Sequence, residues 1–196
     1  MRTTATRIWV EGTIIAALSM ALSFIPLSIG PSFSISLGQI PLAVFALRRG
    51  TKPALLAAFI WGMLHFPLGQ AYFLSVIQVL IEYPIAFTFV GFTGIAAVKL
   101  RQALLNNDLH MAQQQIIWGV LVGSVARYFW HFVAGVAFWG SYALWGMNPW
   151  MYSLIMNGAS GLATAVVTVV VLVILLRMMP TLFMPKDVKR TEILTK

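Results

Sequence analysis

The chain of 196 residues contains no cysteine and little charge. The absence of cysteine excludes a disulfide-stabilised scaffold and any metal site built on thiolates. Only 9% of the residues are charged and 60% are hydrophobic, whereas soluble domains carry about 25% charged residues. A folded monomer with so few charges cannot cover its surface with polar groups, so an ordinary water-soluble enzyme is excluded. The same composition excludes an intrinsically disordered chain.

Motifs for nucleotide binding and for hydrolysis are also missing. The chain has no G-x-x-x-x-G-K-[ST] phosphate-binding loop, no H-E-x-x-H and no G-x-S-x-G. We therefore expect that the protein is not an enzyme and that it uses no metal or other cofactor. Any energy for transport would come from a partner protein or from an ion gradient.

Long apolar segments dominate the chain. A membrane-spanning helix needs about 20 mostly apolar residues, because the hydrocarbon core is about 30 Å thick. Six candidates are separated by turn-forming residues, and no linker or internal repeat divides the chain. We predict an all-α integral membrane protein with six transmembrane helices in a single domain, residues 1–196. The expected spans are 8–27, 35–47, 53–68, 72–98, 114–139 and 150–176.

One expected span, 35–47, is short for a bilayer. It is therefore expected to be tilted, partly re-entrant, or extended by the Ser-rich stretch before it.

The basic residues predict an orientation. Every Lys and Arg except Arg127 lies in a segment that faces the cytoplasm if the N-terminus is inside, and the three opposite loops carry none. The positive-inside rule then places both termini in the cytoplasm. Because the basic residues are dispersed, the net charge of +8 indicates topology and not a nucleic-acid partner. The inner segments are 1–7, 48–52, 99–113 and 177–196.

Two charged side chains, Glu82 and Arg127, lie deep inside the expected spans, whereas Glu11 lies near the inner end of the first. A charged group at membrane depth costs about 2.5–3.5 kcal/mol on insertion scales, so it faces a partner or a water-filled cavity. The two residues either form a structural ion pair between helices or belong to a functional site.

Polar and aromatic residues accompany these two charges on three spans. Arg127 and His131 are four residues apart and share one helix face. A carboxylate with an amide matches the edge of an aminopyrimidine, and aromatic faces hold a flat ring or a cation. Singly, the aromatics also fit an interfacial belt, and His131 or Asn157 a helix–helix hydrogen bond. Together they indicate a pocket for a small, flat, polar heterocycle. The candidate residues are Tyr72, Glu82, Tyr83, Arg127, His131, Trp139, Tyr152 and Asn157.

The first span carries Thr13, Ala17 and Ala21 at a spacing of four, and Ala16 widens this stripe of small residues. Small-x-x-x-small stripes allow two membrane helices to approach closely. The stripe fits a docking face for another membrane protein, and it fits packing within the six-helix bundle equally well.

Four stretches of the chain are similar to one known family. They are IPLAVFALRRG at 40–50, AYFLSVIQVLIEY at 71–83, RYFWHFVAGVAFW at 127–139 and YSLIMNG at 152–158. Over nearly its whole length the chain resembles the thiamine-specific substrate-binding components (S-components, ThiT type) of energy-coupling factor (ECF) transporters.

This resemblance implies a six-helix S-component bundle in the bacterial plasma membrane, with high-affinity thiamine binding near the outer face. It implies as partners a transmembrane coupling subunit and two cytoplasmic ATPases, which would hydrolyse the ATP. The stripe Thr13, Ala17 and Ala21 would dock the coupling subunit. The implied thiamine contacts are Tyr72, Glu82, Tyr83, His131, Trp139, Tyr152 and Asn157.

The resemblance also suggests a role for several of these residues. Glu82 would accept hydrogen bonds from the aminopyrimidine, supported by Asn157. His131 and Trp139 would sandwich a ring, and Tyr72 and Tyr152 would line the pocket. Arg127, where related sequences tend to carry Lys, would set the ionisation of Glu82.

The loop before the second span departs from the family. Related thiamine binders tend to place a Trp there and a Glu four residues later, whereas this chain has Ser32 and Ser36, with Phe33 beside them. Phe33 and Ser36 are candidate loop contacts, but the carboxylate that would attract a thiazolium cation is missing. Two alternatives follow. Either the protein binds thiamine with a rearranged lid, or it binds a related ligand such as the hydroxymethylpyrimidine moiety. An autonomous small secondary transporter, a membrane enzyme and an accessory subunit are further alternatives.

Overall fold

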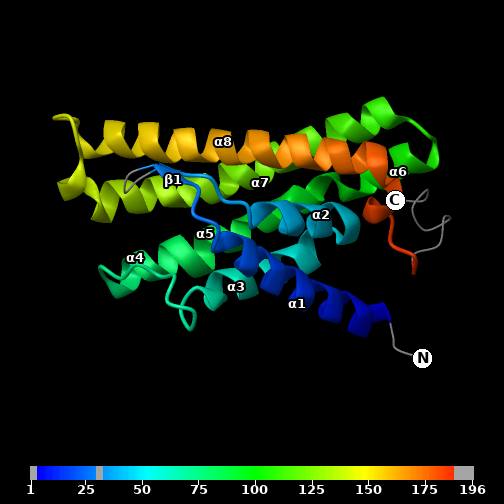
Figure 1. Cartoon of the computed structure of the whole chain (residues 1–196), viewed down its shortest axis with the longest axis horizontal. Helices are drawn as coiled ribbons and strands as arrows, with labels where there is room; N and C mark the ends of the chain where they lie inside the picture. The colour runs from blue at the N-terminus through cyan, green and yellow to red at the C-terminus, as the bar shows by residue number, and fades with distance from the viewer. Residues whose placement is uncertain (1–3, 30–32, 188–196) are drawn as a thin grey trace.

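A computed structural model describes residues 4–29 and 33–187 (Figure 1). Five helices of 11 to 30 residues are α1 (Thr4–Ser23), α2 (Gln39–Arg49), α3 (Thr51–Leu64), α7 (Leu109–Phe138) and α8 (Pro149–Met178). A sixth helical unit joins α3 to α7 and consists of α4 (Val76–Leu80), η1 (Ile81–Ile85), α5 (Ala86–Phe89), η2 (Val90–Ala96) and α6 (Ala97–Leu105). Short elements in the connections are β1 (Ser28–Ile29), β2 (Phe33–Ser34), η3 (Gly140–Tyr142) and η4 (Pro180–Phe183).

Four of the helical units are long and apolar enough to cross a bilayer. α3 is a shorter apolar helix, and α2, with 11 residues, rises only about 16 Å at 1.5 Å per residue. The sixth unit begins at Val76, so Tyr72 of the expected span 72–98 precedes the helix. The four long units are Ala5–Ser23, Val76–Leu105, Leu109–Phe138 and Pro149–Met178.

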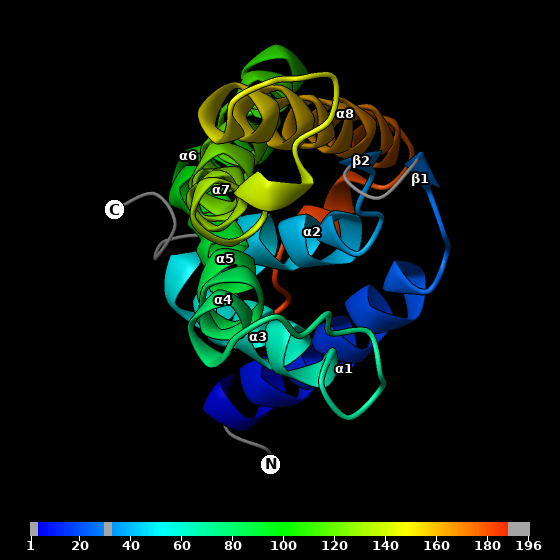
Figure 2. The same cartoon turned by 90° about the vertical axis from the view of Figure 1, so that its left-hand side faces the viewer.

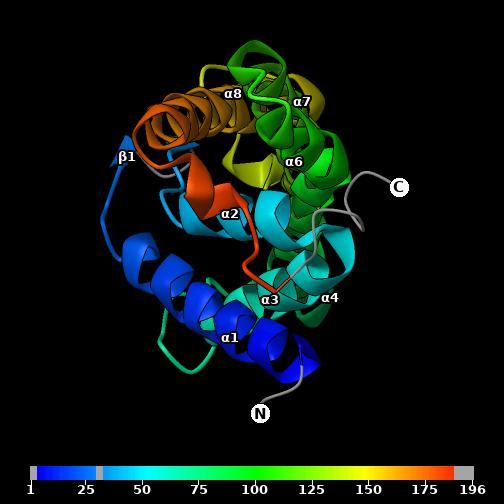
Figure 3. The same ribbon diagram turned by 90° about the vertical axis from the view of Figure 1, so that its right-hand side faces the viewer.

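The short helix α2 occupies the centre of the bundle. Viewed along the long axis from either end, the other helices surround it (Figures 2 and 3). Its residues from Pro41 to Leu47 are all buried, which makes it apolar on every side instead of amphipathic. A helix that faces protein all round does not need the length of a lipid-exposed span.

The chain before α2 has extended backbone, and the helix itself begins only at Gln39. β1 and β2 form an antiparallel pair in which Ile29 lies opposite Phe33. The backbone N–H of Ser34 donates to Ser160 Oγ (3.2 Å) and that of Ser36 to Thr164 Oγ1 (3.1 Å), both on α8. Non-helical backbone at membrane depth needs such partners, because no lipid group can replace them.

The sixth helical unit changes geometry at Pro84. Proline has no N–H to donate, and the turn Ile81–Ile85 is a π-helix. Thr88 Oγ1 donates to the carbonyl oxygen of Pro84 at 2.5 Å. A π-turn adds a residue to the helical path and is frequent at functional sites. Here it contains Glu82 and Tyr83.

The end of the bundle that holds the start of α1 and the end of α8 carries a charge network (Figure 1). Glu11 pairs with Arg48 Nε (2.7 Å) and with Arg49 Nη2 (2.5 Å). Arg49 Nη1 also pairs with Asp187 at 2.7 Å. Burial by itself would raise the pKa of Asp187, but the hydrogen bonds from Arg49 and from its own backbone, together with the charges of Arg49 and Arg7, lower that pKa overall. The network joins α1, the end of α2 and the segment after α8.

Arg48 also binds backbone of the C-terminal segment. Its Nη1 donates to the carbonyl oxygens of Leu182 (2.7 Å) and Met184 (2.9 Å). Phe183 between them is fully buried against the core. Arg48 and Arg49, which the sequence indicated only as topology signals, therefore also fix the C-terminal segment beneath α2.

Close helix approach in this fold depends on Gly91. A Cβ at Gly91 would lie 2.5 Å from the backbone nitrogen of Leu55, whereas a Cβ at Gly158 would meet no atom within 4 Å. We expect Gly91→Ala to destabilise the protein by about 1–3 kcal/mol through overpacking. The control Gly158→Ala is expected to leave stability unchanged or raise it slightly, since Ala favours the helix. Thermal unfolding in detergent measures both, and equal stabilities would contradict the close contact.

Candidate functional site

A cavity of about 820 Å³ opens at the end of the bundle opposite the charge network. Its walls come from the segment before α2, from η1 and α5, and from α7 and α8. Every pocket residue expected from the sequence lines it, namely Tyr72, Glu82, Tyr83, Arg127, His131, Trp139, Tyr152 and Asn157. Residues up to 85 positions apart in the chain are thus brought to one cavity by the fold.

Glu82 is held by two donors. Trp139 Nε1 donates to Glu82 Oε1 at 2.7 Å, and Gln78 Nε2 donates to the other carboxylate oxygen. The carboxylate therefore has a fixed orientation, and part of its accepting capacity is already used before any ligand binds.

Gln78 contacts Glu82 without itself lining the cavity. It is fully buried. Its Nε2 also donates to the carbonyl oxygen of Tyr72 (3.1 Å), and its Oε1 accepts from the N–H of Leu74 (3.0 Å). Gln78 and Glu82 are four residues apart, and this spacing is a signal in the sequence that the two side chains are neighbours on one helix face. Only the folded loop, however, shows that Gln78 also fixes the chain around Tyr72.

The part of the cavity wall formed by α8 contains the side-chain amide of Asn157. Asn157 Nδ2 donates to Ser153 Oγ (3.1 Å), which in turn donates to the carbonyl oxygen of Phe132 on α7 (2.8 Å). Gly135 of α7 packs directly against this pair. A Cβ at this position would collide with both Ser153 Oγ and Asn157 Nδ2. The amide oxygen of Asn157 has no such intramolecular bond described, which leaves an acceptor on the cavity wall.

Aromatic rings line the cavity at two levels. Near its mouth, the Trp139 ring lies 5.2 Å from Tyr72 and 5.6 Å from Tyr142. Deeper, His131 lies 6.1 Å from Phe87 and 5.4 Å from Tyr128. His131 and Trp139 are eight residues apart, a rise of about 12 Å along α7. The two levels can therefore receive two separate flat groups.

The deeper level includes two residues that the sequence did not assign to the site. Phe87 stacks on Tyr83 (5.9 Å) and lies 4.5 Å from His65. His65 lines the cavity, whereas Trp61, one turn earlier on α3, is fully buried in the core. Phe87 carries no sequence signal, because a Phe inside an apolar helix fits lipid or core equally well.

Arg127 does not pair with Glu82, so the structural ion pair left open by the sequence is not formed. Its guanidinium lies over the rings of Phe87 (4.3 Å), Trp61 (5.1 Å) and Tyr128 (5.2 Å). The three ion pairs found within 4–29 and 33–187 all belong to the charge network at the other end of the bundle.

The two candidate loop contacts differ. Ser36 lines the cavity, whereas Phe33 sits in β2 and is not among the lining residues. Ser32 lies outside the described residues. Within the described residues of this loop no carboxylate faces the cavity. No cluster of three or more metal-binding side chains occurs in the described part of the chain.

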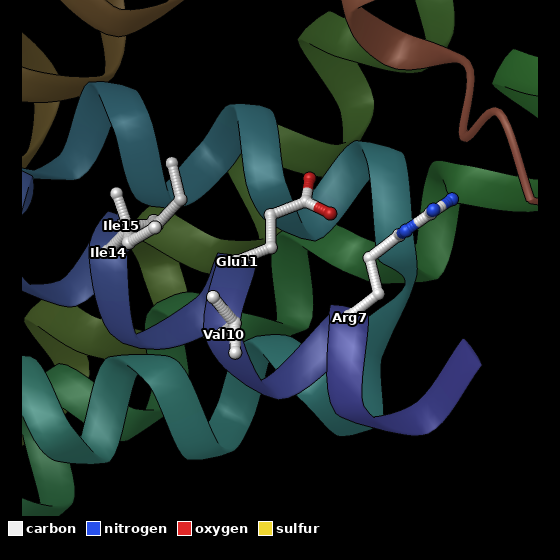
Figure 4. A pocket seen from close by; sticks show the side chains of 5 residues that line it. All are labelled: Arg7, Val10, Glu11, Ile14 and Ile15. Carbon is white, nitrogen blue, oxygen red and sulfur yellow. The ribbon is translucent and has the colours of Figure 1, made fainter. Parts of the chain in front are cut away.

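A second, smaller cavity of about 380 Å³ lies on α1, and Figure 4 shows Arg7 and Glu11 extending to the same side of that helix. The stripe Thr13, Ala17 and Ala21 is exposed along α1. Ala16, which the sequence suggested as a widening of the stripe, is fully buried and faces the bundle.

The fold and the large cavity define a class: a multi-pass helical membrane protein with an internal, partly polar site sized for a small organic molecule. Comparison with known proteins gives the family. The model of the family described as thiamine transporter protein (Thia_YuaJ) matches residues 9–184. The chain therefore belongs to the thiamine transporter protein family.

Individual relatives agree with this assignment. The thiamine transporter ThiT of Lacticaseibacillus paracasei is 45% identical over 183 residues, 91% of each chain. ThiT of Bacillus subtilis strain 168 is 27% identical over 176 residues, 88% of this chain and 92% of the relative. A solved structure of ThiT from Listeria monocytogenes has a TM-score of 0.92 at 48% identity, covering 93% of this chain and 100% of that one.

These findings confirm several expectations from the sequence. They confirm the resemblance to thiamine-specific S-components and the all-α membrane bundle. They also confirm a multi-pass protein of the bacterial cell membrane that works in transport and not as an enzyme.

Removing the hydrogen bonds of Gln78 should loosen the mouth of the cavity. We expect Gln78→Met, which keeps the size of the side chain, to lower stability by about 1–3 kcal/mol because buried partners are left unsatisfied. Hydrogen–deuterium exchange should rise over residues 70–78. Gln114→Met, at an exposed position of α7, is the matched control. Unchanged exchange in Gln78→Met would refute the bracing role.

Proposed function

We propose that this chain is the thiamine-binding subunit of an uptake system and that thiamine binds in the cavity of about 820 Å³. The observation that carries the proposal is the convergence of all eight candidate residues on that one cavity. The membership in the thiamine transporter protein family supports thiamine as the ligand.

The two aromatic levels match the two rings of thiamine, an aminopyrimidine joined by a methylene group to a thiazolium cation. In this proposal Glu82 accepts hydrogen bonds from the aminopyrimidine and Asn157 completes that edge. Trp139 and Tyr72 stack against the ring nearer the mouth, while His131 and Tyr83 contact the deeper part of the ligand. Tyr152, which is 5% exposed, closes the wall from α8.

Replacing the carboxylate tests this arrangement. We expect Glu82→Gln to weaken thiamine binding by about 10- to 100-fold, since a hydrogen bond to a charged group contributes about 1.5–3 kcal/mol. Asp108→Asn is the control, because Asn keeps the helix cap at the far end of α7 while removing one carboxylate. Tryptophan fluorescence titration of the purified protein in detergent measures the affinity. Equal affinities of Glu82→Gln and wild type would remove Glu82 from the site.

The presence of Ser36, where related thiamine binders tend to carry a carboxylate, suggests a second candidate ligand for the cavity. A loop that presents Ser36 instead of a carboxylate holds the thiazolium cation less strongly, while the pyrimidine-binding residues are retained. The same titration with hydroxymethylpyrimidine separates the two ligands. Binding of the pyrimidine without binding of thiamine would favour the smaller ligand.

We further propose that transport is driven by an ECF module, consisting of a transmembrane coupling subunit and two cytoplasmic ATPases. The chain has no phosphate-binding loop of its own. The exposed stripe Thr13, Ala17 and Ala21 supports docking of the coupling subunit on α1, since small side chains let a second helix approach closely. Thr13 Oγ1 is satisfied by the carbonyl oxygen of Trp9 in the same helix (3.0 Å), so it adds no unpaired polar group to that face.

Reconstitution separates binding from coupling. We expect proteoliposomes with this chain alone to show no thiamine uptake, and proteoliposomes with the full module and ATP to show it. Ala17→Leu should keep wild-type thiamine affinity and lose most uptake, because the larger side chain separates the helices. Ala159→Leu, at an exposed position of α8, is the matched control. Uptake by the chain alone would instead identify an autonomous secondary transporter.

A further inference from the structure

Arg127 is a buried cation without a counter-ion at the floor of the cavity. Its side chain is 4% exposed, and it lines the cavity. Its one hydrogen bond within the described part of the chain is a long one, from Nη1 to Gln39 Oε1 at 3.4 Å. Nε has no hydrogen-bond partner within the described part of the chain, and no described carboxylate pairs with the guanidinium.

The surroundings of Arg127 stabilise its charge only in part. The faces of Phe87, Trp61 and Tyr128 supply cation–π contacts at 4.3–5.2 Å. Gln39 is already engaged as a donor to Ser124 Oγ (2.7 Å), so its amide is fixed and its oxygen is the acceptor turned to Arg127. Rings and one amide oxygen do not replace an anion, because a guanidinium has five N–H donors and binds oxyanions or halides strongly.

Glu82 is not that anion. It is bound to Trp139, which lies twelve residues beyond Arg127, a rise of about 18 Å along α7. Thiamine itself carries no anionic group and brings a further positive charge into the same cavity. A cationic ligand and an unpaired guanidinium repel each other most where water is excluded.

We propose that Arg127 forms the floor of a subsite for a small monovalent anion, and that this anion is bound together with the cationic vitamin. The inference rests on the proposed function, because it takes the cation to occupy the same cavity. The anion accepts hydrogen bonds from the free N–H groups of Arg127 and screens its charge from the thiazolium. Since coupling between two ligands is reciprocal, anion and vitamin each raise the affinity for the other.

Anion exchange at constant ionic strength tests the subsite. Thiamine is titrated into the detergent-solubilised full chain in sodium chloride and in sodium gluconate, whose anion is much larger than chloride. We expect affinity in gluconate to fall by about tenfold, the size of one charge–charge interaction at roughly 10 Å with an effective dielectric constant near 20. Restoring chloride should restore the affinity. Bromide in place of chloride should give an anomalous diffraction peak beside Arg127 in crystals.

Variants separate the subsite from general salt effects. Arg127→Met should make thiamine affinity independent of the anion, while Arg127→Lys should keep the dependence. Lys52→Met removes an exposed cation at the start of α3 and should also keep it. If Arg127→Met does not fold, the wild-type titrations and the bromide peak decide the question alone.

The outcomes also separate this inference from the proposed function. Thiamine binding of equal affinity in chloride and gluconate, with no bromide at Arg127, would overturn the anion subsite and leave thiamine binding in place. Absence of thiamine binding in every salt would overturn the proposed function itself. A bromide peak at Arg127 without any effect on thiamine affinity would overturn the joint binding.

Discussion

Lipid offers no hydrogen-bond partner, so backbone polar groups that leave regular helix at membrane depth need partners within the protein. This constraint explains why the segment before α2 can be extended there. Ser160 and Thr164 of α8 accept hydrogen bonds from its backbone, and the turn containing Pro84 is satisfied by Thr88. In both of these places, neighbouring hydroxyl groups complete the departure from regular helix.

The position of the cavity follows from the short helix α2 at the centre of the bundle. Because α2 is short, the cavity lies at its N-terminal end, where Ser36 and Leu37 just before the helix are among the lining residues. At the C-terminal end of α2, Arg48 and Arg49 tie α1 and the C-terminal segment to α2 through Glu11, Asp187 and backbone carbonyls. At the N-terminal end, polar groups and rings line a space instead of packing against one another.

Charge is distributed unevenly within that space. The carboxylate of Glu82 lies near the mouth, held by Trp139 and Gln78, and the guanidinium of Arg127 lies at the floor among rings. The loop that carries Ser36 contributes no acid. A cavity with one fixed carboxylate and one unpaired cation suits a ligand that is polar at one edge and flat overall. In our proposal, the affinity of the cavity for a cationic ligand then depends on whether an anion is bound beside Arg127.

The amino-acid sequence alone was enough to predict the class of the protein, the helical bundle and the residues that gather at the cavity. Composition excludes water-soluble folds, and ionisable residues such as Glu82 and Arg127 are so unfavourable in lipid that their presence alone indicates a cavity. Which side chains contact each other became visible only in the folded protein. Gln78 rather than Arg127 contacts Glu82, Phe87 joins the site without any signal in the sequence, and Arg49 bridges Glu11 and Asp187. Helical spacing fixes which residues share one face of a helix, but contacts between helices depend on their relative rotation and depth, which packing of the whole bundle sets.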